Sequence, residues 1–185
     1  MSLFEFLMVL VSLIIGLGVA ELLSGVARVI RNRNSVRVYW VHSTFIVIVF
    51  LALLQQWWES WGARDVPAWT FLGLLMMLGG PIGLFLIAHL LFPEEFEGVD
   101  FQDYYYECMT SVLWIAIASI LVSTTFRPVV FGGQLLTWDN LSSLLIMALF
   151  IVMVFTRNAV FHGVAAVVIL SALLADIILF NMEIR

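Results

Sequence analysis

Six apolar stretches, each about long enough to cross a bilayer, dominate this sequence. A helix that spans roughly 30 Å of hydrocarbon needs about 20 mostly apolar residues. Lipid offers backbone groups no hydrogen-bond partners, and alternating strand patterns are absent, so helices are expected. We therefore predict an all-α, polytopic integral membrane protein, with a single transmembrane domain over residues 1–185 built as a bundle of six transmembrane helices. The approximate spans are 3–27, 39–58, 69–92, 104–126, 139–156 and 159–182.

Composition excludes several kinds of chemistry. The chain is 63% hydrophobic and 11% charged, and all eight of its basic residues are arginines. Without a lysine there is neither a Schiff-base amine nor the phosphate-binding lysine of a P-loop. The single cysteine, Cys108, cannot form an internal disulfide. No signature of an intramembrane hydrolase or of nucleic-acid binding is present, so an enzyme is less expected than a transport or structural protein, and no nucleic-acid partner is expected.

The arginines also predict an orientation. Four of them crowd the loop between the first two spans: Arg28, Arg31, Arg33 and Arg37. Cytoplasmic loops of membrane proteins carry an excess of basic residues. We therefore expect the loop that holds these arginines to be cytoplasmic and both termini to lie outside, as in a protein of the bacterial inner membrane. The same arginines are candidates for contact with anionic lipids.

The third span contains a helix-weakening sequence near its middle. Gly79, Gly80 and Pro81 interrupt the apolar run, and proline removes a backbone donor. A kink or a break is predicted there. Interrupted helices in transporters expose backbone groups to a central site. The alternative is a kink that serves only packing, because Gly and Pro are common in membrane helices.

Ionisable residues inside the spans are the main functional candidates, because such groups are costly in lipid and usually face a bundle interior or a wet cavity. Five fall near the inner ends of five different helices: Glu21, His42, His89, Glu107 and His162. Carboxylate and imidazole are proton carriers and metal ligands, so these five residues form a candidate proton or metal-cation site. Asp176, the deepest acid of the outer half, is a candidate to continue a polar route. In the alternative interpretation each side chain reaches the headgroups separately, and Glu21 pairs with Arg28.

Two further patterns predict contacts, one between helices and one between loops. Gly16, Ala20 and Ser24 form a stripe of small residues beside Glu21, which permits close approach of another helix. The neighbour is either a second subunit, giving a homo-oligomer, or a helix of the same chain. Residues 94–103 form an acidic loop that also contains phenylalanines, and we expect it to face the arginines of the first loop.

Three functions remain open from the sequence. The first is a channel or transporter for protons, a cation or a small solute. The second is a haem- or metal-binding membrane protein that uses His42, His89 or His162. The third is an accessory or scaffold membrane subunit with no transport activity.

Overall fold

The structure, a computed structural model, describes residues 3–66, 69–131 and 138–180 and is built from helices. Within these residues no strand is present, and the prediction of an all-α bundle is confirmed. The elements are α1 (Leu3–Arg31), α2 (Trp40–Glu59), the short 3-10 helix η1 (Ser60–Asp65), α3 (Phe71–Leu90), α4 (Phe101–Phe131), α5 (Trp138–Phe155) and α6 (Ala159–Phe180).

The helices have the lengths and compositions of membrane spans. Five are long and apolar enough to cross a bilayer, namely α1, α2, α3, α4 and α6. The apolar part of α5, Asn140–Phe155, is shorter, and the fifth span was also expected to be the shortest. The protein is therefore a helical membrane bundle, and a lipid bilayer is its solvent.

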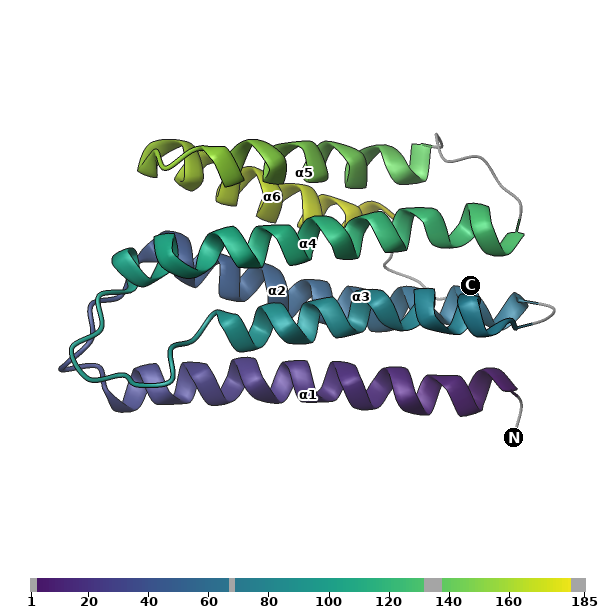
Figure 1. Ribbon diagram of the computed structural model, residues 1–185, viewed down its shortest axis with the longest axis horizontal. Helices are drawn as coiled ribbons and strands as arrows, with labels where there is room; N and C mark the ends of the chain where they lie inside the picture. The colour runs from purple at the N-terminus through teal and green to yellow at the C-terminus, as the bar shows by residue number, and fades with distance from the viewer. Residues whose placement is uncertain (1–2, 67–68, 132–137, 181–185) are drawn as a thin grey trace.

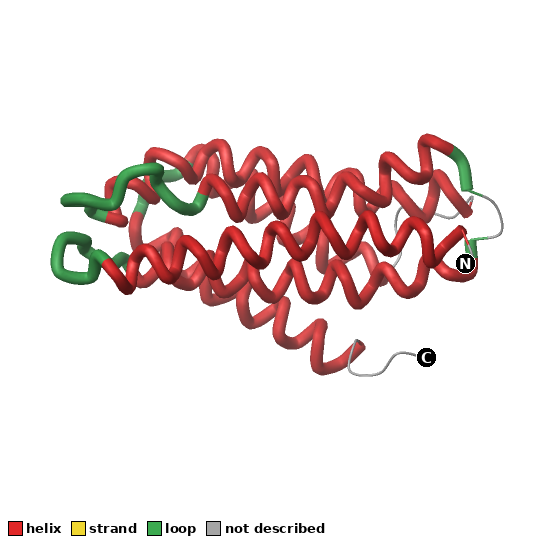
Figure 2. The backbone as a smooth tube through the Cα atoms, turned by 90° about the horizontal axis from the view of Figure 1, so that it is seen from below, coloured by secondary structure: helices red, strands yellow, loops and turns green. Residues whose placement is uncertain are grey.

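The helices are arranged in two layers. Figure 1 shows α1, α3, α4 and α5 side by side, with α2 and α6 behind them. Helix α3 packs extensively against both α1 and α4, α5 packs on α4, and α2 contacts α1, α3 and α6. Helix α6 diverges from the bundle toward its C-terminal end, as Figure 2 shows. Helix α1 is thus joined to the rest of the bundle mainly through α3, and also directly through α2.

The helix connections place a group of arginines at one end of the bundle. The α1–α2, α3–α4 and α5–α6 connections lie at one end, and the start of α1 and the last turns of α6 lie at the other (Figure 1). The arginines of the first loop and Arg157 of the α5–α6 hairpin therefore share one end of the bundle. This agrees with an even number of crossings. That this end is cytoplasmic stays a prediction.

Helix boundaries differ from the predicted spans mainly where helices continue past the apolar run. Helix α1 extends beyond residue 27 to Arg31, and α4 begins at Phe101 and runs through Pro128 to Phe131. Arginine is a good helix former and its charge is favourable at a helix C-terminus, which explains the extension of α1. The predicted end of the last span, residues 181–182, lies outside the described residues.

The sequence predicted a kink or a break in the third helix. The break is wrong, because α3 is one continuous α-helix from Phe71 to Leu90 with Pro81 inside it, and the kink stays a prediction. Its glycines bring α4 close. A Cβ atom on Gly79 would lie 2.8 Å from Val122 Cγ1, and one on Gly83 would collide with Ser119 Oγ. Small residues four apart permit this backbone approach between membrane helices. The glycines therefore serve packing, the alternative that the sequence left open.

This packing predicts that Gly83→Ala destabilises the bundle by about 1–3 kcal/mol, the usual cost of overpacking. The added methyl group would meet Ser119. Thermal unfolding in detergent, followed by circular dichroism, measures the change. Gly62→Ala is the control, because a Cβ at the exposed Gly62 has no atom within 4 Å. The double variant Gly83→Ala/Ser119→Gly should regain stability. Equal melting temperatures for Gly83→Ala and Gly62→Ala would contradict the assigned contact.

Candidate functional site

Glu21, His89 and Arg28 form a group of polar side chains on the side of the bundle where α1 meets α3. The Nδ1 atom of His89 lies 3.2 Å from Glu21 Oε1, and Nη2 of Arg28 lies 3.7 Å from the same oxygen. The side chains are 27% exposed for Glu21, 35% for Arg28 and 63% for His89. Two of the five predicted inner residues therefore meet, and the expected Glu21–Arg28 pair is present. We call these three residues the α1–α3 polar group.

Arg28 also joins this polar group to the acidic loop. Its guanidinium carbon lies 4.9 Å from the centroid of the Phe96 ring, and its Nε is buried with no hydrogen-bond partner among the described residues. A second contact between the two loops pairs Arg37 with Asp100 at 3.8 Å. Backbone hydrogen bonds link Arg37 to Val99 and Phe101. The acidic loop thus faces the arginine loop, as the sequence predicted, with the Phe96 side chain buried between them.

His42 is buried in the first turn of α2 and its side chain is bound to a backbone carbonyl. Its Nε2 lies 2.8 Å from the carbonyl oxygen of Leu91, just beyond α3, so this nitrogen donates to the carbonyl. The imidazole is 4.8 Å from the centroid of the Phe101 ring and is 2% exposed with the rest of the residue. The hydrogen bond satisfies a carbonyl that the end of α3 leaves without a helical partner.

His162 makes two hydrogen bonds, one from each ring nitrogen. Nε2 lies 2.6 Å from the carbonyl oxygen of Thr156 and donates to it. Nδ1 lies 2.7 Å from the hydroxyl of Tyr105 and shares a hydrogen bond with it. The Tyr105 ring also lies 6.5 Å from the His42 ring, so both buried histidines flank this tyrosine. Tyr105 was not among the predicted site residues, and the run Tyr104–Tyr106 was the only signal for it in the sequence.

The remaining two candidates lie elsewhere. Glu107 is exposed on α4. Asp176 accepts a hydrogen bond of 2.6 Å from Gln55 Nε2, and the same amide donates to Glu59 Oε1 at 2.8 Å. Asp176 therefore joins α6 to α2, away from the end of the bundle that carries the arginine loop. Interhelical polar contacts of this kind are ordinary in membrane proteins.

The five residues that were predicted to form one site are therefore not gathered in one place within a single chain. Within residues 3–66, 69–131 and 138–180, no three His, Cys, Asp or Glu side chains lie close enough together to hold a metal ion. His42 and His162 each donate a hydrogen bond from Nε2 to a backbone carbonyl. The His89 imidazole is exposed and is therefore the most accessible of the three. The α1–α3 polar group is the part of the predicted cluster that the fold assembles.

The stripe of small residues on α1 lies beside this group and faces outward. Gly16, Ala20 and Ser24 are all exposed, whereas Gly18 and Gly25 are buried against Leu53 and Phe92. Packing within the chain therefore uses a different set of small residues on α1. The predicted stripe remains available to a neighbour.

Comparisons with protein-family models, with curated proteins and with solved structures each found no match to this chain.

The buried tyrosine–histidine pair predicts that Tyr105→Phe lowers the stability by about 1–3 kcal/mol, because the Nδ1 atom of His162 is then buried without a partner. Chemical denaturation in detergent measures the loss. Tyr106→Phe is the control, since the Tyr106 hydroxyl has no hydrogen-bond partner among the described residues. A Tyr105→Phe variant as stable as wild type would show that this hydrogen bond does not hold α4 to α6.

Proposed function

We propose that the protein is a homo-oligomeric membrane protein that passes protons at the α1–α3 polar group, which a second copy covers. The observation that supports this most directly is the partly exposed Glu21–His89 pair within membrane-spanning helices. The homo-oligomer and the proton transfer are separable parts of the proposal, and each has its own test.

The position of the pair is the first argument for a covering subunit. Glu21 precedes Arg28 by about two helical turns, which places it roughly 10 Å deeper along α1. Ionisable groups at such depth normally face a bundle interior or a water-filled cavity rather than acyl chains. In a single copy, Glu21 and His89 lie instead on an outward side of the bundle. A neighbouring subunit would complete their surroundings.

The adjacent small-residue stripe is the second argument. Exposed Gly16, Ala20 and Ser24 recur at four-residue spacing along α1, flanking Glu21. Such stripes let two membrane helices approach closely, and cyclic dimers are the commonest symmetric assembly. A second copy of this chain is therefore the neighbour to which we commit.

The chemistry of the pair favours protons. Imidazole and carboxylate are the side chains that most often carry protons in membrane proteins, and here they lie 3.2 Å apart with Arg28 3.7 Å from the same carboxylate oxygen. Two copies packed on α1 would bring two such pairs to one interface. Among the alternatives, an accessory or scaffold subunit needs the same interface but no proton transfer. The haem alternative has less support, because His42 and His162 both donate to carbonyls.

Oligomerisation through α1 predicts that Ala20→Leu shifts the protein toward the monomer, because the larger side chain prevents close approach of two α1 helices. Subunit counting by single-molecule photobleaching in nanodiscs measures the stoichiometry. Ala118→Leu is the matched control, the same change at an exposed alanine on α4. A monomeric wild type, or an Ala20→Leu variant with unchanged stoichiometry, would rule out this interface.

Proton transfer predicts that Glu21→Gln and His89→Gln each reduce proton flux to the level of empty vesicles, because neither amide can carry a proton. Proteoliposomes with an internal pH-sensitive dye and an imposed potential measure the flux. Glu107→Gln is the control, since Glu107 is an exposed carboxylate on α4. Flux that both amide variants retain would refute the transport part. An intact oligomer without flux would instead favour the scaffold function.

A further inference from the structure

Arg28 connects the α1–α3 polar group to the acidic loop. Its Nη2 lies 3.7 Å from Glu21 Oε1, and its guanidinium carbon lies over the Phe96 ring, 4.9 Å from the centroid. The Phe96 residue is only 7% exposed. One arginine side chain therefore contacts both a carboxylate within a membrane-spanning helix and a buried aromatic ring at the end of the bundle.

The position of Phe96 affects the hydrogen bonds that join the acidic loop to the arginine loop. The N–H of Arg37 donates to the Val99 carbonyl, and the N–H of Phe101 donates to the Arg37 carbonyl, each at 2.9 Å. The Phe96 ring lies 6.3 Å from the Phe101 ring, beside the second of these bonds. The Arg37–Asp100 ion pair adds little, because the Arg37 side chain is 87% exposed.

Proton uptake by Glu21 and His89 would change the charge that faces Arg28. Without the proton, the two groups are a carboxylate and a neutral imidazole, and their net negative charge balances the guanidinium. With the proton, they are neutral overall, whichever of them carries it. His89 Nδ1 lies 3.2 Å from the same oxygen that Arg28 approaches. Arg28 therefore loses its counter-charge for either location of the proton.

We propose that Arg28 transmits proton binding at the α1–α3 polar group to the acidic loop, which is held while the group is unprotonated and released when it takes up a proton. This rests on the proton uptake that the proposed function assigns to Glu21 and His89, and it requires neither a second copy nor proton flux. Without its counter-charge the guanidinium moves away from Glu21, and Phe96 loses its cation–π contact.

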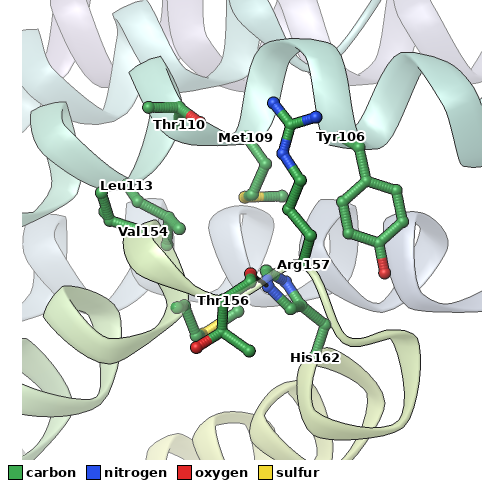
Figure 3. Close-up of a pocket in the computed structure, with 9 residues that line it drawn as sticks. Tyr106, Met109, Thr110, Leu113, Val154, Thr156, Arg157 and His162 are labelled. Atoms are coloured by element: carbon green, nitrogen blue, oxygen red, sulfur yellow. Dashed lines mark hydrogen bonds between the residues drawn. The ribbon is translucent and has the colours of Figure 1, made fainter.

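Other titratable groups near the acidic loop are distinguishable from Glu21 and His89. His42 of α2 is bound to the Leu91 carbonyl. Figure 3 shows His162 in a shallow pocket between α4 and the α5–α6 hairpin, where Tyr105 and Thr156 bind it. Exposed or partly exposed acids lie on the loop and at the start of α4: Glu94, Glu95, Glu97, Asp100, Asp103 and Glu107. All of these groups are unchanged in Glu21→Gln.

Hydrogen–deuterium exchange of the full chain in nanodiscs tests the proposal, with peptides that cover residues 33–38 and 94–102 read by mass spectrometry. The amides of Arg37 and Phe101 report opening of the contact between the two loops. The measurements are made at about pH 5 and about pH 8, the range in which imidazole commonly titrates. Variants are compared with wild type at the same pH, which cancels the pH dependence of the exchange chemistry.

At about pH 8, Glu21→Gln should exchange these amides about two- to fivefold faster than wild type, the effect of losing one contact of this kind. At about pH 5 the two proteins should exchange alike, because wild type has then lost the same charge. Glu107→Gln is the matched control, the same change at an exposed carboxylate on α4, and should match wild type at both pH values.

Phe96→Leu tests the loop side of the coupling and leaves Glu21 and His89 intact. Its exchange should exceed that of wild type more at about pH 8 than at about pH 5, because the contact with Arg28 is already lost at the lower pH. In a Phe96→Leu background, Glu21→Gln should add nothing. Circular dichroism checks that each variant is folded, and Phe96→Leu decides the question by itself if Glu21→Gln does not fold.

A ratio of exchange between Glu21→Gln and wild type that is the same at both pH values would overturn the proposal, as would a ratio of one at about pH 8. An equal excess for Phe96→Leu at both pH values would overturn it as well. Loop release in a protein without proton flux would support it while refuting the transport part of the proposed function. Proton flux without any loop response would refute the coupling alone.

Discussion

Close packing at the glycines of α3 is the interaction on which the rest of the bundle depends. Membrane helices gain little from the hydrophobic effect when they associate, so tight contact between them supplies much of the stabilisation. Helix α3 lies between α1 and α4 and brings its glycines against Val122 and Ser119. On its other side, Gly25 of α1 receives Phe92 from the segment after α3. This double contact fixes the position of α3 and hence that of His89 beside Glu21.

The buried histidines owe their positions to helix ends. The last carbonyl groups of a helix lack partners within it, and lipid supplies none. His42 binds the carbonyl of Leu91 beyond α3, and Tyr104 binds that of Leu90. His162 does the same for Thr156 after α5, and Tyr105 fixes its other nitrogen. These residues hold the arginine-bearing end together, which is a structural use of groups that resemble proton carriers in the sequence.

The proposed subunit interface lies at one edge of the bundle. Helix α1 lies at one edge of the front layer and α5 at the other, as Figure 1 shows. An oligomer formed through α1 would therefore leave α5 facing lipid. At the α1 edge, polar side chains remain partly exposed on membrane-spanning helices, which is why a partner is inferred there.

The sequence by itself determined the number, order and approximate limits of the helices, because bilayer thickness sets the length of an apolar span. It also placed the ionisable residues by depth. The position of a residue along its helix does not say which neighbouring helix its side chain contacts, however, because that depends on how the helices pack. Only the tertiary structure showed that Glu21 meets His89 while His42 and His162 bind carbonyls. It also showed that α3 continues through Pro81 and that the glycines expected to interrupt it are the places where α4 packs closely.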